Sequence, residues 1–475
     1  MKILDQQQSL FDDYISICKS MDNDQPKIIA LLNEHIDFET YIPTSFYHSF
    51  YRTMGRPREY SLVSFIKFFV LQKLLGVTDK ALLIILKISA ELRDFCEFNK
   101  VPDAAKITRF RQDFVIHIKR LFDNFVEVTE PICRELDPKK ADYLIYDPTG
   151  AEAYVAENNP KFLNAKLKQI KKQTKDNPDI NPYALAYSQM PEVSSTNPLA
   201  KQQYINGHFC YAFKNGVLAN GLGIVRDIAF FDESFKRDHP ETVTKKTDNP
   251  ELDKEISDSV SLKPVLTDFY KTHSTFSYKT FLGDSAFDSY ENFGMLRKEF
   301  HFERMVIPIN SRNSSSNTHK DFDDDGTPLC PIDKTPFMFV GICRGKNRSQ
   351  RFKYVCHKSV PVTKSSDHVC ECETPCTDST YGRCVYTYPD KDLRLYPGIA
   401  RGTDHWDNLY RHRVLVERTI NTLKNTFNTG DRKSFSIRSV KSDFYFAGIT
   451  QLVGVILAHA INKPELYKSV RKLIA

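Results

Sequence analysis

The chain has 475 residues, of which 41% are hydrophobic and 27% are charged. This is ordinary globular composition, so it excludes a disordered or fibrous protein, and the length suits two to four structural units. The net charge of +6, from 66 basic and 60 acidic residues, is by itself only weak evidence for a polyanionic partner.

The start of the chain, MKILDQQQSLFDD, has no apolar core typical of a secretory signal. The longest apolar runs are Leu62 to Val77, interrupted by Lys67 and Lys73, and Gly448 to Ile461. These runs are too short or too charged to cross a bilayer, so we expect a cytoplasmic protein with no membrane partner.

Residues 1–135 are predicted to form a helical N-terminal domain. The stretches SLVSFIKFFVLQKLLGV, ALLIILKI and FRQDFVIHIKRLFDNFVEVTEPI repeat apolar residues at helical spacing. Turns are expected at Gly55 to Pro57, at Gly76 to Asp79 and at Val101 to Asp103. Short helices with basic turns favour a DNA-binding bundle, and a bundle that only packs on the rest is the alternative.

Residues 136–310 alternate strands with helices, which predicts an α/β core. YLIYDPTG is expected to be a buried strand ending at an Asp-Pro turn, and HFCYAFKNGVLANGLGIVRDIAFF a hairpin turning at Asn215-Gly216 or at Asn220-Gly221. LKPVLTDFYKT and SYENFGMLRKEF are predicted helices, whereas YKTFLGDSAFD and ERMVIPIN each begin with a strand.

Residues 311–400 are rich in Asn, Ser, Asp, Gly, Pro and Cys, so they are predicted to be an insertion of short strands and loops. Residues 401–475 are predicted to return to the core. This last part has a strong helix from Asp407 to about Phe427 and a final apolar helix, Tyr445 to Ile461, that caps the core.

Two aspartates are expected at strand ends: Asp147 in YDPTG and Asp284 in LGDSAFD. Such positions lie at the edge of a sheet, where active sites of α/β folds gather. An aspartate at a strand end is also a common turn former. Asp232 and Asp288 are rivals for the second position, with helix capping as their alternative role.

The helix from Asp407 carries a polar stripe. With about 100° per residue, Tyr410, Arg413, Glu417 and Lys424 lie within about 60° of one another. The stripe borders an apolar seam, so Glu417 is expected to be partly shielded. The alternative is a surface helix with an Arg413–Glu417 ion pair. The seam consists of Leu409, Val416, Ile420, Leu423 and Phe427.

These residues carry a resemblance to a known family. In YRHRVLVERTINTLK, Tyr, Arg, Glu and Lys are separated by two, three and six residues. This resembles the YREK signature of DDE transposases from bacterial insertion sequences. YDPTG and FLGDSAFDS are similar to the two strands that bear aspartates in that family. GRPREYS, LLGVTDKAL and PDAAKITRFRQ resemble its helical N-terminal region, and residues 50–460 are covered in all.

The resemblance implies an RNase H-like catalytic core, a mixed sheet with flanking helices. It implies a transposase that cleaves DNA at element ends and joins them to target DNA. Asp147, Asp284 and Glu417 would hold two Mg²⁺ or Mn²⁺ ions, with Asp147 shared between them. Tyr410, Arg411, Arg413 and Lys424 would contact DNA. Oxygen ligands suit Mg²⁺, and two ions can assist both oxygens of an in-line displacement at phosphorus.

The resemblance also implies partners and alternatives. Bringing two element ends together implies a homodimer on DNA, and the protein would be nucleoid-associated in a bacterial cytoplasm. A catalytically inactive or domesticated DNA-binding protein is one alternative function. An RNase H-like nuclease without strand transfer is another.

Two further features of the sequence are its clustered cysteines and its single tryptophan. Seven of the eleven cysteines lie between Cys330 and Cys384, which suggests a structural Zn²⁺ site; free thiols in a small β insertion are the alternative. Trp406 is the only tryptophan; it either stacks on an unpaired DNA base or packs at the helix start. The zinc ligands expected are Cys356, Cys370, Cys372 and Cys376.

Overall fold

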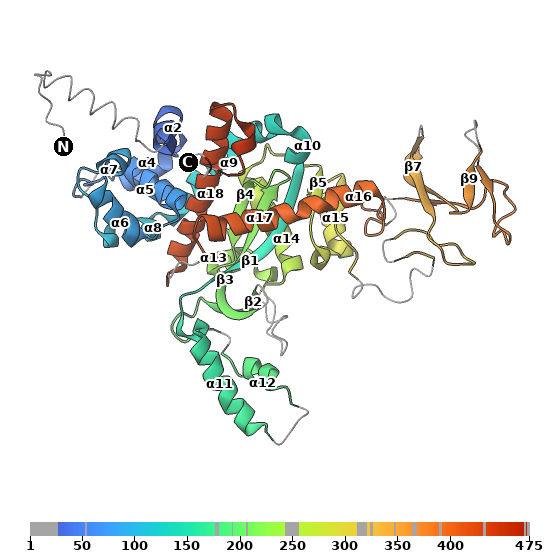
Figure 1. Ribbon diagram of the computed structural model, residues 1–475, viewed down its shortest axis with the longest axis horizontal. Coiled ribbons are helices and arrows are strands. Elements are labelled where there is room, and N and C mark those ends of the chain that lie inside the picture. Colours follow the sequence, from blue (N-terminus) through green and yellow to red (C-terminus); the bar gives the residue numbers. More distant parts are fainter. Residues whose placement is uncertain are drawn as a thin grey trace, which may run out of the picture. The chain divides into compact units, whose positions relative to one another are not determined.

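The computed structural model divides into two compact units, residues 1–132 with 422–475 and residues 133–421. Figure 1 shows the helices and strands of both. The structure describes residues 27–475 except 53–54, 176–179, 192, 206–207, 243–255, 311–320, 324–325, 346–347, 363–367, 389–391, 431–433, 470–471 and 473–475.

The first unit is helical. Its N-terminal part contains the predicted helices, and the turns between them lie where Gly and Pro residues predicted them. The C-terminal part adds a π-helical turn, a long helix and a short 3₁₀ turn. The elements are α2 (Lys27–His35), α3 (Phe38–Tyr41), α4 (Thr44–Phe50), α5 (Leu62–Leu75), α6 (Asp79–Ile88), α7 (Ala90–Phe95), α8 (Ala104–Asp113), α9 (Val115–Leu136, which runs into the second unit), η6 (Thr422–Thr426), α18 (Ile437–Ala460) and η7 (Pro464–Leu466).

Capping residues set the bounds of α5 and α6. The Ser61 hydroxyl accepts a hydrogen bond from the Ser64 N–H at the start of α5. Gly76 ends this helix with φ of +64°, a left-handed conformation that glycine adopts without steric cost. Thr78 then caps α6 by accepting from the Ala81 N–H. The end of α5 and the start of α6 thus lie within the turn predicted at Gly76 to Asp79.

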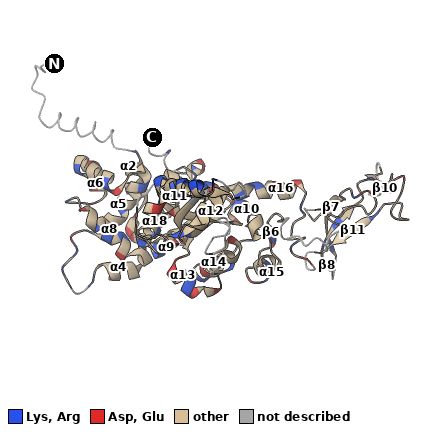
Figure 2. Cartoon of the chain, turned by 90° about the horizontal axis from the view of Figure 1, so that it is seen from below, with Lys and Arg blue, Asp and Glu red and all other residues tan. Residues whose placement is uncertain are grey.

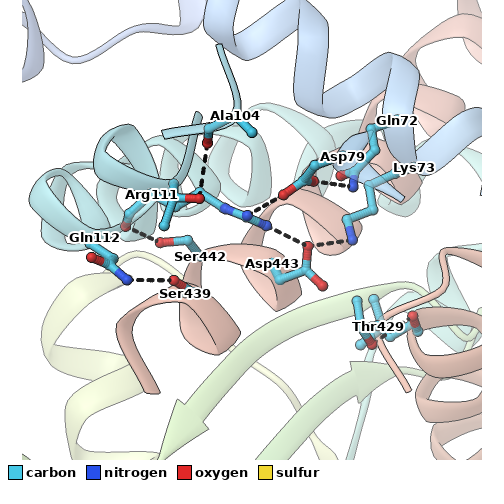
Figure 3. Close-up of polar contacts among 12 residues, drawn as sticks. Gln72, Lys73, Asp79, Ala104, Arg111, Gln112, Thr429, Ser439, Ser442 and Asp443 are labelled. Carbon is cyan, nitrogen blue, oxygen red and sulfur yellow. Dashed lines mark hydrogen bonds and ion pairs between the residues drawn. The ribbon is translucent and has the colours of Figure 1, made fainter. Parts of the chain in front are cut away.

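Helix α18 begins at Ile437, eight residues before the predicted start at Tyr445. Its first two turns carry buried polar residues, so the apolar pattern did not reveal them. Figure 3 shows how they are satisfied: Ser442 donates to the Arg111 carbonyl, and Gln112 donates to Ser439. Tertiary partners therefore replace apolar packing in this part of the helix.

A buried ion pair joins α5 to α18. Lys73 Nζ lies 2.5 Å from Asp443 Oδ1, and both side chains are 1% exposed. Arg111 Nη1 lies 3.8 Å from the same oxygen and also pairs with Asp79 (Figure 3). Burial lowers the pKa of Lys73, and the positive charge of Arg111 lowers it further. A buried charge without its partner is strongly destabilising, so this cluster makes the unit depend on residues 370 positions apart.

By length and composition alone, α18 would pass as a membrane-crossing helix, but 89% of its most apolar window is buried inside the structure. Its aromatic side chains pack on the N-terminal helices, as where Phe446 stacks on Phe69 with ring centroids 4.4 Å apart. Within the described residues, this helix is the core helix of the first unit.

The second unit is built on a mixed sheet of six strands. The order is β2-β3-β1-β5-β6, with β4 paired to β3. The central strand β1 is antiparallel to β3 and parallel to β5. The bounds are β1 (Tyr143–Glu152), β2 (Lys201–Ile205), β3 (His208–Asn220), β4 (Val225–Phe230), β5 (Thr280–Leu282) and β6 (Arg304–Val306).

The hairpin of β3 and β4 turns at Asn220-Gly221, the later of the two predicted dipeptides. The Asn220 side chain accepts from the N–H groups of Leu222 and Ile224 and so closes the turn. Gly216 instead lies inside β3, where a Cβ atom would come within 2.5 Å of the Tyr146 hydroxyl. The first Asn-Gly dipeptide therefore does not form a turn; its glycine leaves room for the packed ring of Tyr146.

The two faces of β1 have different neighbours because side chains alternate along a strand. Leu144 and Tyr146 belong to a buried aromatic core with residues of α14 (Asp258–Thr272) and α15 (Tyr290–Lys298), the two predicted helices. Asp147 alternates to the other face, over which α17 (Val414–Asn421) packs on β1 and β3. This arrangement is a mixed α/β fold, and the RNase H-like class stays a prediction.

The predicted insertion consists of short strands and loops in its described part. One sheet has the order β11-β8-β7, and β9 pairs with β10. Phe337, Phe352, Tyr354 and Tyr396 form a small core of their own. The strands are β7 (Met338–Gly345), β8 (Arg348–Val355), β9 (Ser359–Pro361), β10 (His368–Cys370) and β11 (Cys384–Thr387).

The predicted division into 1–135, 136–310, 311–400 and 401–475 is finer than the two compact units. It differs from them in its last part, because residues 422–475, including α18, belong with the N-terminal helices. The polar contacts of α18 that hold it there join residues more than 300 positions apart, which no local pattern reports.

We expect Asp443→Ala to lower the free energy of unfolding of the first unit by about 3–5 kcal/mol, because it leaves Lys73 buried without its partner. The double change Lys73→Met with Asp443→Leu should cost much less, since it removes both charges. Urea unfolding followed by circular dichroism measures both. The matched control is Glu59→Ala, which breaks the solvent-screened pair with Lys106 and should cost far less than Asp443→Ala. Equal losses at the two sites would contradict this role for the pair.

Candidate active site

The helix predicted from Asp407 to about Phe427 is not one regular α-helix. It consists of α16 (Asp404–Tyr410), a 3₁₀ turn η5 (Arg411–Arg413), α17 and the π-helical turn η6. The prediction of a uniform helical stripe is therefore corrected, since 3₁₀ and π turns change the rotation per residue. Arg413 and Glu417 nevertheless remain neighbours and form an i,i+4 ion pair.

Asp147 lies in the middle of β1 and not at a strand-ending turn, so that prediction was wrong. The strand continues through Pro148 to Glu152, with Asp147 opposite Val217 of β3. On the other side, the partner β5 ends opposite Ile145. From there β1 is paired on one side only in the described sheet, and proline is tolerated in such a place. Asp147 therefore lies just beyond the end of the parallel pair.

Asp284 lies two residues past the end of β5, in the turn that the sequence predicted after this strand. Its carboxylate accepts a hydrogen bond from the Ala286 N–H at 2.9 Å and caps the 3₁₀ turn η3 (Ser285–Phe287). Since β5 is parallel to β1 and pairs with its first residues, the chain leaves β5 next to Asp147. Parallel strands thus place two carboxylates, 137 positions apart in the sequence, at one place.

One guanidinium contacts all three predicted carboxylates. Arg413 Nη2 lies 3.3 Å from Asp147 Oδ1 and 3.6 Å from Asp284 Oδ2. Its other amino group, Nη1, donates to Glu417 Oε1. The side chains become more exposed from Asp147 (18%) to Asp284 (36%) and Glu417 (47%), so the cluster opens to solvent on its Glu417 side. The structure therefore brings Asp147, Asp284 and Glu417 together around Arg413.

Burial among these charges perturbs the pKa of Asp147. Burial raises the pKa of its carboxyl group to about 7; Arg413 opposes the rise, and the charges of Asp284 and Glu417 add to it. Burial also raises the pKa of Tyr410. Arg413 lowers this pKa, and the charges of Asp284 and Glu417 add to the rise. Perturbed groups of this kind gather at functional sites because catalysis needs charge in a partly dry place.

The rival carboxylates have other roles in the structure. Asp288 is fully buried and forms a two-point ion pair with Arg394, at 2.8 and 2.9 Å, while accepting from the Asn310 N–H. Asp232 caps α13 (Glu233–Asp238) by accepting from the Phe235 N–H. The capping alternative thus holds for Asp232, and Asp288 is a structural residue.

The predicted DNA-contacting residues are placed differently from one another. Tyr410 is close to the carboxylates, and Arg411 is exposed and within 3.4 Å of Asn408 Oδ1. Trp406 is 7% exposed and lies under the Arg401 guanidinium, an arrangement that fits the packing alternative. Lys424 lies in η6, which belongs to the first unit. Their contacts with DNA stay predictions.

The cysteines of the insertion gather partly as expected. A Cβ atom on Gly382 would lie 3.4 Å from Cys370 Sγ and 3.6 Å from Cys356 Cβ. Burial raises the pKa of Cys356, and three other thiols add to it: Cys370, Cys376 and Cys330, which was not among the predicted ligands. Cys372 donates to the Thr374 carbonyl instead. Across the described ranges, no group of three or more His, Cys, Asp or Glu is spaced to hold a metal, and zinc stays a prediction.

Comparison with known proteins gave one family match. Residues 18–113 match a family described as "Transposase domain (DUF772)". Over these residues the chain is therefore similar to a transposase domain. The match covers the N-terminal helices through α8 and does not reach the carboxylate cluster.

Other comparisons gave less. No curated protein sequence matches the chain. Among solved structures, the chain is similar to that of a piggyBac transposase synaptic complex with hairpin DNA, with a TM-score of 0.37 and 12% identity. The alignment covers 94% of this chain and 77% of that one. Similarity at this level does not define a shared fold.

We expect Asp147→Asn to stabilise the protein at pH 8. An acid whose pKa is raised on folding, here from 3.8 to about 7, destabilises the folded state once it ionises. The stability of the wild type should thus fall as pH rises from about 4 to 7 relative to the variant, by at most about 4 kcal/mol. Denaturant unfolding at several pH values measures the difference. Asp232→Asn, which keeps a capping residue, is the control, and a gain that shrinks with rising pH would contradict the expected sign.

Proposed function

We propose that this chain is a DNA transposase whose catalytic carboxylates are Asp147, Asp284 and Glu417. The observation that carries the proposal is their meeting around Arg413, although they come from β1, from the end of β5 and from α17. The transposase domain at residues 18–113 supports the same conclusion from a separate part of the chain. The proposed reaction is hydrolysis at the element ends followed by joining of the freed 3′-hydroxyl to target DNA.

The donor set fits two Mg²⁺ or Mn²⁺ ions by its chemistry, because carboxylate oxygens are the ligands that these hard cations prefer. Asp147 would be shared, and Asp284 and Glu417 would each complete one ion. When bound, such ions lower the pKa of an attacking oxygen and neutralise charge developing on phosphate. The cation now among the carboxylates is the Arg413 guanidinium, and no metal-holding group is preformed in the described part of the chain.

Arg413 has two roles in this proposal. Its guanidinium neutralises part of the carboxylate charge in the absence of other cations. A guanidinium also donates paired hydrogen bonds that match phosphate geometry. Once the carboxylates have other counter-ions, Arg413 is free to turn its donors toward a DNA phosphate. Tyr410, half-buried beside it, has a hydroxyl with a raised pKa and thus stays a neutral hydrogen-bond donor.

Two alternatives have different predicted outcomes. A catalytically inactive DNA-binding protein would bind element ends without cutting them. A nuclease without strand transfer would cut them and leave no joined product. The cluster of three carboxylates favours an enzyme, since a binding protein has no need to bring like charges together against their repulsion.

We expect Asp147→Ala, Asp284→Ala and Glu417→Ala each to reduce cleavage of element-end DNA at least about 100-fold in Mg²⁺, because each removes a metal ligand. The substrate is a duplex carrying the inverted repeats that flank the coding region, incubated with a target plasmid. DNA binding by the variants should stay near the wild-type level. The matched control is Asp232→Asn, which alters a rival carboxylate that caps α13.

The DNA products of this reaction distinguish a transposase from a nuclease and from an inactive DNA-binding protein. Cut ends joined to the plasmid support the transposase, whereas cutting without joining supports the nuclease. No cutting by the wild type with either Mg²⁺ or Mn²⁺ would contradict both enzyme readings. Full cleavage by Asp147→Ala would show that the carboxylates are wrongly assigned.

We expect Arg413→Gln to make the protein respond more strongly to metal. Removing the guanidinium leaves three carboxylates without their internal counter-ion, so Mg²⁺ or Mn²⁺ should raise the melting temperature of this variant more than that of the wild type. The measurement is a thermal shift over increasing metal concentration. Arg394→Gln, which removes the partner of buried Asp288, is the control and should lose stability without a gain in metal response. Equal metal responses of Arg413→Gln and wild type would place the metal elsewhere.

A further inference from the structure

A basic helical hairpin follows β1 directly. It consists of α11 (Pro160–Gln173) and α12 (Pro182–Ser188), inserted before β2. Residues 160–175 contain six lysines and no acidic residue. Figure 2 shows blue, the colour of Lys and Arg, along the ribbon of α11. They are Lys161, Lys166, Lys168, Lys171, Lys172 and Lys175.

The charge of this segment accounts for the charge of the whole chain. The net charge is +6, from 66 basic and 60 acidic residues. Without the six lysines, the remainder of the chain has equal numbers of each. Residues 160–175 thus carry a local charge of +6, as expected for a surface that binds a polyanion.

Three of the lysines, Lys161, Lys168 and Lys172, lie opposite the face of α11 that packs. At about 100° per residue, these three side chains fall within about 40° of one another and form a stripe along α11. Leu163, Leu167 and Ile170 lie on the opposite side of the helix and pack with Leu185 and Ala186 of α12. The stripe from Lys161 to Lys172 is about 16 Å long, enough to follow several phosphates of a nucleic-acid backbone.

Within the described residues, none of these six lysines forms an ion pair. Elsewhere, lysines pair with acids one helical turn away: Lys119 with Asp123, Lys140 with Asp137, and Lys236 with Glu233. Lys171 contacts only the half-exposed ring of Tyr183, with Nζ 5.0 Å from the ring centroid. The stripe thus has charge available for an external partner.

The hairpin is attached firmly to the sheet. The Asn158 amide donates to the carbonyls of Ala153 and Tyr211 at 2.7 and 2.8 Å and accepts from the Tyr211 N–H. Glu157 is buried and accepts from Ser194 and Ser195. Burial opposes ionisation of Glu157, but these hydrogen bonds prevail and lower its pKa. The residues just before α11 are therefore fixed to β3 and to Ala153, the first residue after β1.

The length of chain between Asp147 and Lys161 sets an upper limit on the distance between the stripe and the carboxylates. Asp147 and Glu152 lie on one strand about 17 Å apart, and α11 begins eight residues after Glu152. Even fully extended, this path places Lys161 within about 50 Å of Asp147. That distance corresponds to about 15 base pairs of a duplex.

We propose that the lysine stripe of α11 binds the backbone of double-stranded DNA flanking the cleaved phosphate, without reading its sequence. The inference rests on the proposed function for the identity of the nucleic acid. Phosphate contacts of this kind position a duplex and carry no sequence information.

The test is DNA binding by the full chain in EDTA, on an Asp147→Ala background, so that no cleavage interferes. The stripe variant is Lys161→Gln with Lys168→Gln and Lys172→Gln; glutamine keeps helix propensity. Fluorescence anisotropy with 30-base-pair duplexes, of element-end and scrambled sequence, is measured over a series of salt concentrations. The slope of log K against log salt should become shallower by about 2 to 3, and affinity at 0.1 M salt should fall at least about tenfold, equally for both duplexes.

A matched control removes the same charge from the same unit: Lys139→Gln, Lys271→Gln and Lys298→Gln, all at exposed positions. The control should keep nearly the wild-type slope. An unchanged slope for the stripe variant, or an equal change for the control, would overturn the proposal. A larger loss for an RNA duplex of the same length than for DNA would overturn it as well.

This experiment is independent of catalysis. If the carboxylate variants cut DNA normally while the stripe variant loses binding, the catalytic assignment fails and the stripe proposal stands. If the carboxylate variants are inactive and the stripe variant binds normally, the stripe proposal alone fails. Circular dichroism of each variant shows whether α11 remains folded.

Discussion

The candidate site depends on a single guanidinium. Arg413 lies between three carboxylates that would otherwise repel one another in a partly buried place. Its charge opposes the burial that raises the pKa of Asp147 to about 7. Three carboxylates around one guanidinium leave an excess of negative charge, which attracts cations. A metal-dependent phosphoryl-transfer site needs this electrostatic property.

The sheet provides the framework for this arrangement. Antiparallel pairing with β3 and parallel pairing with β5 place β1 at the centre, and Asp147 lies just past the end of the parallel pair. Asp284 follows the neighbouring strand, and α17 crosses the same face with Glu417. The same strand continues toward the basic hairpin of α11, so a carboxylate centre and a lysine stripe share one support.

Local signals predicted much of the secondary structure. Apolar periodicity and turn residues predicted helices α5 and α6, the strands around Asp147 and Asp284, and the hairpin of β3 and β4. Errors occurred where local patterns were ambiguous or interrupted. The Asp-Pro of β1 reads as a turn but continues as a strand, and the helix bearing Glu417 contains 3₁₀ and π turns.

The sequence by itself determined the α/β alternation, the helical N-terminal region and the spacing that singled out Glu417 with Arg413. Only the tertiary structure decided which aspartates join them: Asp284 does, Asp288 is neutralised by Arg394, and Asp232 caps a helix. The tertiary structure also showed that the Trp406 side chain is buried and that α18 belongs with the N-terminal helices. The physical reason is that periodicity and capping are local, whereas ion pairs such as Arg413–Asp147, 266 positions apart, depend on how distant segments pack.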